Sequence, residues 1–236
     1  MRRKYRAVIF DAGGTLIGQD DPLGFEKDLS AAFGALGVSV TAQQIQALLP
    51  GLQTAATRRR KCIGGWSRTP EEDRQSILWV GSYMLESLGV TEDIEGKATA
   101  IYGRFAAGEF IGLFSDVKPT LERLTQTGIT MGVLSNYAPF LERNLRVLNI
   151  HHYFAFLVVS SLVGFEKPDP RIFQMAMQEA GCPHEDILYV GDSLPDDVEG
   201  AKGVGLDVVL LDRFDRFPDA DCQRIRSLGQ LLDIVA

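Results

Sequence analysis

Five short apolar runs divide the chain, and they predict the strands of a buried sheet. They span residues 7–10, 129–134, 156–159, 187–190 and 208–211. None of the runs alternates regularly between apolar and polar positions, which is typical of strands covered on both faces in a parallel sheet. A helix-like stretch precedes each of the last four runs, at residues 119–126, 139–148, 170–180 and 195–202. Alternation of strand and helix predicts an α/β fold with a doubly wound parallel sheet.

The connection between the first and second runs is far longer than a crossover needs. It contains four stretches with apolar residues every three or four positions, at 25–36, 42–60, 70–88 and 92–107. Loops beyond about 12–15 residues usually have structure of their own. We therefore expect a discontinuous core domain, residues 1–18 and 113–236, with an inserted helical cap domain over residues 19–112. The cap is expected to hinge near Gly18 and Gly112.

Composition excludes several classes of partner and compartment. The 236 residues carry a net charge of −7, which argues against a nucleic acid or an anionic membrane as the main partner. No apolar run approaches the roughly 20 residues that span a bilayer. The three cysteines, Cys62, Cys182 and Cys222, are too scattered for a disulfide framework or a zinc site. We expect a cytoplasmic protein, and the sequence leaves its oligomeric state open.

Polar residues stand where the predicted strands end. Asp11 follows the first run, Ser135 and Asn136 follow the second, and Lys167 lies in the segment after the third. The fourth run leads to residues 191–197, which include Asp192, Asp196 and Asp197. Ligands of open α/β sheets bind at the carboxyl ends of the strands, so these groups are expected in one crevice. Carboxylates, a hydroxyl, a lysine and loop amides suit a phosphate group together with Mg²⁺.

These motifs together resemble those of the haloacid dehalogenase (HAD) superfamily, in the subgroup with a helical C1-type cap after the first strand. The resemblance covers essentially the whole chain. Its four motifs are residues 11–16, Ser135, Lys167 and residues 191–197, in the expected order. The resemblance implies a hydrolase, specifically a phosphatase for a small phosphorylated metabolite.

The resemblance also implies a role for each motif residue. Asp11 would attack phosphorus and form an aspartyl-phosphate, while Ser135 and Lys167 would bind the phosphoryl oxygens. Asp11, Asp192 and the backbone carbonyl of Gly13 would hold Mg²⁺, with Asp197 or its neighbour Asp196 in support. Further substrate contacts are expected from Gly14, Thr15 and Asn136.

The departure from the phosphatase pattern is Gly13, where related phosphatases usually carry a second aspartate. That side chain protonates the leaving oxygen and then activates water, and glycine can do neither. A positioned acid–base is worth roughly 10²–10⁴-fold, so we expect weak hydrolysis of alkyl phosphates. A substitute acid could come from Asp20, Asp21 or Glu26 near the hinge.

Three other interpretations stay open. One is a HAD-fold protein that binds a phosphate ligand or a protein partner with little or no turnover, which Gly13 favours. Another is a haloacid dehalogenase, which the Gly191-Asp192 pair opposes. A third is a phosphonate hydrolase, which needs a cap lysine that residues 49–54 lack. The basic run 58–61 is interpreted as a solvated helix face, with substrate recognition as the alternative, and Arg213 and Arg216 as surface residues.

Overall fold

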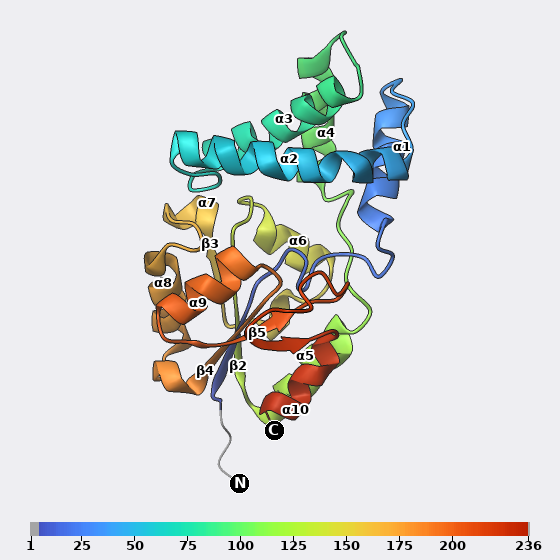
Figure 1. The fold of residues 1–236 in the computed structure, drawn as a ribbon. Helices are drawn as coiled ribbons and strands as arrows, with labels where there is room; N and C mark the ends of the chain where they lie inside the picture. The colour runs from blue at the N-terminus through green and yellow to red at the C-terminus, as the bar shows by residue number, and fades with distance from the viewer. Residues whose placement is uncertain (1–4, 236) are drawn as a thin grey trace.

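The structure is a computed structural model that describes residues 5–235. Its centre is a six-stranded sheet with strand order β3-β2-β1-β4-β5-β6, and every strand pair is parallel (Figure 1). The strands are β1 (Ala7–Phe10), β2 (Thr130–Ser135), β3 (Phe156–Val159), β4 (Ile187–Gly191), β5 (Asp207–Leu211) and β6 (Gln223–Ile225). The prediction of an α/β fold with a doubly wound parallel sheet is confirmed.

The sixth strand, β6, corrects the expectation of five. It has three residues, lies at one edge of the sheet and pairs with β5, where Leu211 is opposite Ile225. Ile225 is its one buried residue, whereas Gln223 is exposed. An edge strand needs only one covered face and one paired side, so it carries no continuous apolar run.

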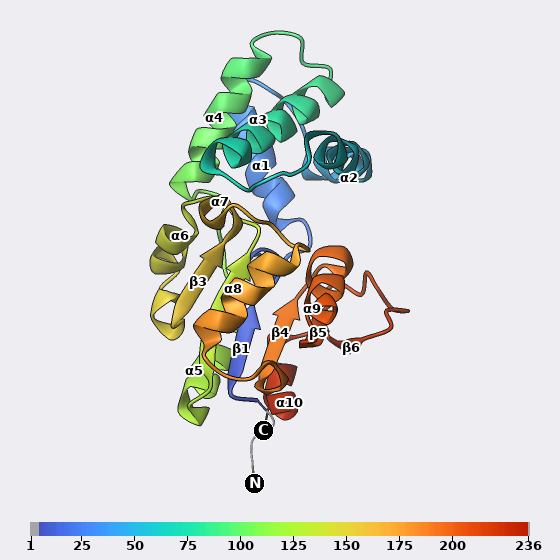
Figure 2. The ribbon, with the colours of Figure 1, turned by 90° about the vertical axis from the view of Figure 1, so that its left-hand side faces the viewer.

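Helices cover both faces of the sheet, as Figure 2 shows. Val8 and Phe10 of β1 pack with helices α5 (Val117–Thr127), α6 (Leu141–Val147) and α10 (Leu231–Val235). Ala7 and Ile9 point to the opposite face and pack with α8 (Pro170–Ala180) and α9 (Glu199–Gly203). Successive side chains of a strand face opposite ways, so a strand between two helical layers must be apolar throughout.

Four helices follow β1 and precede α5 in the chain, and they form a separate layer that we call the helical insert. They are α1 (Gly24–Ala35), α2 (Ala42–Ile63), α3 (Pro70–Ser87) and α4 (Ile94–Ala107). The insert has an apolar core of its own, which includes Phe33, Ile45 and Leu85. Helix α2 begins with a capping box at Thr41. It ends at Ile63, three residues beyond its predicted end, and Gly64 caps it with φ 74°. Within residues 5–235, no helix is long and apolar enough to cross a membrane.

The helical insert lies over the carboxyl ends of the strands, toward which the strand arrows of Figure 2 point. Its two connections to the sheet run side by side, because the Gly18 amide donates to the Gly112 carbonyl at 3.0 Å. A Cβ on Gly112 would lie 2.9 Å from the Gly18 carbonyl oxygen, so this close approach requires glycine. The short helix α7 (Ser160–Val163) faces the insert from the end of β3.

Candidate active site

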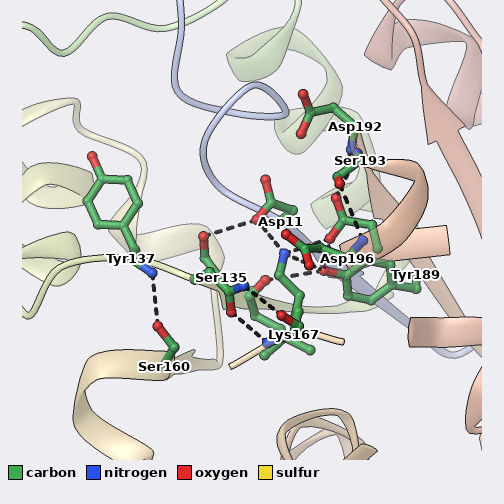
Figure 3. Close-up of polar contacts among 12 residues, drawn as sticks. Asp11, Ser135, Tyr137, Ser160, Lys167, Tyr189, Asp192, Ser193 and Asp196 are labelled. Atoms are coloured by element: carbon green, nitrogen blue, oxygen red, sulfur yellow. Dashed lines mark hydrogen bonds and ion pairs between the residues drawn. The ribbon is translucent and has the colours of Figure 1, made fainter. Parts of the chain in front are cut away.

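The register of the sheet brings three of the predicted strand ends together. Phe10 lies opposite Val133 of β2 and Val190 of β4, so the next residue, Asp11, stands between two strand ends. Its amide donates to the Val190 carbonyl at 2.8 Å. Figure 3 shows the side chains of Asp11, Ser135 and Lys167 pointing toward one another. The expected crevice at the carboxyl ends of the strands therefore contains these groups.

Lys167 is buried at the centre of this cluster. Its Nζ donates to Oδ1 of Asp11 at 2.7 Å and to Oδ1 of Asp197 at 2.6 Å, and it lies 3.1 Å from the Tyr189 hydroxyl. Burial alone would lower the pKa of Lys167, but the carboxylates of Asp11 and Asp197 outweigh burial and raise the pKa well above its usual value. The site therefore holds a fixed positive charge beside Asp11.

Asp11 presents one engaged and one open oxygen. Oδ1 accepts from Lys167 and, at 3.0 Å, from the Ser135 hydroxyl. Oδ2 accepts no hydrogen bond from any residue between 5 and 235. Burial raises the pKa of Asp11 to about 7 against the opposing effect of Lys167, and the nearby Asp197 and Asp192 add to the rise. The cluster thus has more negative charge than Lys167 can balance.

Asp197 holds the cluster together through both carboxylate oxygens. Oδ1 accepts from Lys167 and from the Tyr189 hydroxyl, the latter at 2.8 Å. Oδ2 accepts the amides of Asp192 at 3.1 Å and Ser193 at 2.9 Å. Two partners on each oxygen use the hydrogen-bonding capacity of a carboxylate. Of the two neighbouring acids that the sequence left open, Asp197 is therefore the one inside the cluster.

Tyr189 is a site residue that the sequence analysis missed. It lies inside β4, and its apolar neighbours gave it the appearance of a core position. The hydroxyl is fully buried and bonded to Asp197, and burial raises its pKa well above the usual value. The available signal was its position two residues before the end of the strand. Side chains at alternate positions of a strand point to the same face.

Asp11 and Asp192 have carboxylate oxygens that fit a divalent cation, and Asp197 lies beside them. One carboxylate oxygen from each lies within 4.8 Å of the others. Burial raises the pKa of Asp192, as does Asp197, and Arg216 partly opposes this effect through a 2.8 Å contact with Oδ2. Hard carboxylate oxygens are the ligands that Mg²⁺ prefers. Arg216 is exposed, as expected, and its guanidinium also reaches this carboxylate.

The turn after β1 contains two glycines in different surroundings. A Cβ on Gly13 would meet no atom within 4 Å, whereas a Cβ on Gly14 would collide with the carboxylate of Asp192. Gly14 also has φ 79°, the left-handed region that favours glycine. Thr15 is fully buried, and no described residue bonds its hydroxyl. A side chain at position 13 would thus meet open space, whereas none fits at position 14.

Asn136 lies next to the cluster and holds the backbone of Lys167. Its Nδ2 donates to the Lys167 carbonyl at 3.0 Å, and its Oδ1 accepts the Lys167 amide at 2.7 Å. Both ends of the side-chain amide are therefore occupied by one residue. This pair of bonds determines where the lysine side chain starts, so Asn136 orients Lys167 in the structure.

Two of the three hinge carboxylates that were expected to supply a substitute acid have partners outside the cluster. Asp20 accepts the Ser115 amide at 3.2 Å, and Asp21 forms an ion pair with Lys27. Glu26 is buried in the first turn of α1. None of the three has a hydrogen bond to the Asp11 cluster among the described residues.

Arg213 was also expected at the surface, and this expectation is wrong. Its side chain is 8% exposed, stacks on the Phe114 ring at 3.9 Å and donates to the Thr15 carbonyl at 3.0 Å. The aromatic partner lies about a hundred positions away in the sequence. Arg213 thereby supports the turn that follows Asp11.

A cavity of about 250 Å³ lies between the helical insert and the core, beside the cluster. Gln53, Thr57 and Arg60 line it from α2, and Asn136 and Asp196 line it from the core. The basic run was interpreted as a solvated face, and Arg58 is indeed exposed, but Arg60 faces the core. Its guanidinium binds Glu166 and Asp196 at the edge of this cavity.

Comparisons with known proteins agree with this geometry. The family model of haloacid dehalogenase-like hydrolases matches residues 5–205. A relative from Danio rerio, haloacid dehalogenase-like hydrolase domain-containing protein 3, is 27% identical over 91% of this chain and 88% of its own. The glyceraldehyde 3-phosphate phosphatase of Methanopyrus kandleri is 37% identical, over 52% of this chain and 56% of its own. Phosphoserine phosphatase of Thermus thermophilus is 32% identical, over 52% of this chain and 49% of its own. The chain thus spans only about half the length of these two phosphatases.

Solved structures share the fold. The HAD-hydrolase YfnB of Bacillus subtilis, bound to magnesium, has a TM-score of 0.79 at 21% identity, over 98% of this chain and 99% of its own. A 2-haloacid dehalogenase of Pseudomonas syringae has a TM-score of 0.66 at 25% identity, over 98% and 97%. With the family model matching most of the chain and four polar motifs at the strand ends, this protein belongs to the haloacid dehalogenase-like hydrolases.

Proposed function

We propose that this hydrolase is a Mg²⁺-dependent phosphatase that acts on a small phosphorylated metabolite through Asp11. The single observation that carries the proposal is the state of the Asp11 carboxylate. Lys167 and Ser135 hold Oδ1, while Oδ2 accepts no hydrogen bond from the described residues. An oriented carboxylate with one open oxygen is suited to nucleophilic attack.

In the first step, Oδ2 of Asp11 attacks phosphorus and forms an aspartyl-phosphate, while the bond from phosphorus to the leaving oxygen breaks. In the second step, water attacks phosphorus and gives up a proton to solvent, while the bond from phosphorus to Oδ2 breaks. This releases inorganic phosphate and restores the carboxylate. The Lys167 ammonium and the Ser135 hydroxyl stand beside the attacking group, in position to bind the phosphoryl oxygens that carry the negative charge. Preorganised donors at this place stabilise phosphoryl transfer.

The Mg²⁺ site would be formed by Asp11, Asp192 and the backbone carbonyl of Gly13. The ion would neutralise charge on the phosphate group when bound. Asp197 was predicted as a ligand, but its bonds to Lys167, Tyr189 and two amides support a role in positioning the cluster. Magnesium bound to the similar YfnB structure and the excess carboxylate charge here favour the same ion.

The leaving group is the part of the reaction for which this site has no assigned acid. Gly13 stands where a proton donor is expected, and two of the hinge acids, Asp20 and Asp21, have other partners. We therefore infer substrates whose leaving group departs with little protonation, such as acyl phosphates or phosphates of acidic alcohols. The relatives that act on glyceraldehyde 3-phosphate and phosphoserine support a small phosphorylated substrate.

The domain arrangement in this proposal is a core of residues 1–18 and 113–236 with residues 19–112 as a cap. The separate apolar core of the helical insert and its position over the strand ends support this division. A cap in this position would exclude water from the crevice and select the substrate. The two adjacent glycine-bearing connections, at Gly18 and Gly112, are the proposed hinge.

A second candidate is a protein of this fold that binds phosphate or a partner with little turnover. Gly13 favours it, because glycine offers no proton donor at the position where related phosphatases carry an aspartate. The dehalogenase interpretation is supported by the likeness of fold and by the absence of an aspartate at position 13. The acidic cluster of Asp11, Asp192 and Asp197 opposes it, because attack on carbon does not need that cluster.

The decisive experiment measures Mg²⁺-dependent release of p-nitrophenol from p-nitrophenyl phosphate. This phenol leaves with little protonation, so the assay does not depend on the missing acid. We expect turnover by the wild type, loss of turnover in Asp11→Asn, and no change in Asp219→Asn, which makes the same chemical change at an exposed position. An inactive wild type would favour the binding function instead.

A further inference from the structure

One side chain of the helical insert reaches the segment that carries Lys167. Arg60, in the last turn of α2, donates from Nε to Oε1 of Glu166 at 2.7 Å and from a terminal nitrogen to Oδ1 of Asp196 at 3.1 Å. Its other terminal nitrogen donates to the Lys167 carbonyl. All three partners belong to the core, so a single guanidinium connects α2 with two loops of the crevice.

Glu166 binds the helical insert at a second place. Its Oε2 accepts the amides of Trp66 at 2.8 Å and Ser67 at 2.7 Å, in the loop that follows α2. The Glu166 side chain is 9% exposed, so its charge is compensated almost wholly by the insert. We call Arg60, Glu166, Asp196 and the two amides the clamp.

The clamp is connected to the cluster around Asp11 through the carbonyl oxygen of Lys167. The Lys167 carbonyl accepts from Arg60 of the insert and also from Asn136 of the core. The ammonium of the same lysine contacts Asp11. The backbone of Lys167 is thus fixed from two sides, and one of these sides exists only while the helical insert rests on the core.

We propose that Arg60 is a positioning residue that couples closure of the helical insert to the alignment of Lys167 with Asp11. Its kinetic part rests on the proposed phosphatase function. When the insert separates from the core, Glu166 loses three donors and the Lys167 carbonyl loses one. Charged hydrogen bonds of this kind are short, directional and strong in half-buried surroundings, so closure favours one placement of Lys167.

The bonds to Glu166 give a readout that requires no turnover. The amides of Trp66 and Ser67 should exchange slowly with solvent in the closed protein, because both donate to a carboxylate of the core. In Arg60→Met their exchange should accelerate roughly ten- to hundredfold, the range that corresponds to loss of a charged hydrogen bond. The matched control is Arg58→Met, since Arg58 lies on the same helix and is exposed.

The kinetic readout uses p-nitrophenyl phosphate with Mg²⁺ and separates kcat from KM. We expect Arg60→Met to lower kcat roughly ten- to hundredfold with a smaller change in KM, and Arg58→Met to resemble the wild type. A second variant, Glu166→Gln, should lower kcat in the same way. The double variant should be no worse than the poorer single variant, because both act through one assembly.

Three results would overturn the proposal. Unchanged exchange of the two amides in Arg60→Met would show that the clamp does not hold the insert. Faster exchange with unchanged kcat would make the clamp structural only. Equal losses in Arg58→Met would remove its specificity. If the wild type is inactive, the phosphatase proposal fails separately; the affinity for inorganic phosphate with Mg²⁺ then replaces kcat, and an unchanged affinity in Arg60→Met overturns the coupling.

Discussion

A Cβ atom placed on Gly14 would lie 2.4 Å from Oδ2 of Asp192. These two residues come from the ends of different strands, and they approach so closely that one of them can have no side chain. The Asp192 carboxylate thus occupies the space that a side chain at position 14 would need. The neighbouring Gly13 has no such contact, so the two glycines of this turn make a matched pair.

We expect Gly14→Ala to impair the site and Gly13→Ala to be tolerated. The first substitution pushes the Asp192 carboxylate away and places alanine at φ 79°, which costs roughly 1–2 kcal/mol of stability. The second adds a methyl group to free space. Urea unfolding and Mg²⁺ titration of both variants measure the difference. Equal effects of the two substitutions would contradict the geometry of this turn.

Gly13→Asp should create the missing acid–base. Because a Cβ at this position meets no atom within 4 Å, the first atom of an aspartate side chain displaces no neighbour. If the rest of the site is competent, turnover of an alkyl phosphate should rise roughly 10²–10⁴-fold. Gly13→Asn is the control, since it has the same shape and cannot transfer the proton. An increase of the same size in both variants would argue for a steric cause.

Binding of Mg²⁺ should weaken as the pH falls below about 7. Burial raises the pKa of Asp11 to about 7, so at lower pH the ion must displace a proton from this carboxylate. We expect the apparent affinity to fall about tenfold per pH unit in that range. Calorimetric titration from pH 8 to pH 5 measures it. Asp192→Asn should bind Mg²⁺ weakly throughout, and unchanged binding there would remove Asp192 from the site.

The same carboxylate should affect the stability of the metal-free protein. Its pKa is higher in the folded state than in the unfolded chain, so the folded state binds more protons between the two values. The contribution of Asp11 to stability is present below its ordinary pKa of 3.8 and is lost as the pH rises through about 7. Added Mg²⁺ should restore the loss, by roughly 2.7 kcal/mol at a concentration of 100 times its Kd. Thermal unfolding with Mg²⁺ and with EDTA tests this reversal.

The helices and strands of this chain were largely predictable because each carries a local signal. Helix α8 begins and ends where the sequence indicates, since Pro170 suits the first turn and Gly181 the left-handed end. The sheet strands matched their apolar runs within a residue. Strand β6 was not predicted, because an edge strand of three residues has no apolar run and is defined only by its pairing with β5.

The residues at the strand ends of the candidate site were predictable from the sequence, whereas the residues that position them were not. Asp11, Ser135 and Lys167 follow strands, and parallel strands bring their carboxyl ends to one edge whatever the details of packing. The sequence signals of Tyr189 and Arg60 are weaker. Tyr189 shares a face of its strand with the site and Arg60 belongs to a basic run, but only their partners in the structure show what each does.

The sequence by itself determined the parallel α/β sheet, the helical insert and the residues that meet at the strand ends. These follow from periodicity and chain order, which act over a few residues at a time. Only the tertiary structure decided that Asp197 is the neighbour that holds Lys167, and that Arg60 meets Glu166 across 106 positions of the chain. Such contacts depend on how whole layers pack against one another, and burial then makes their few polar bonds strong.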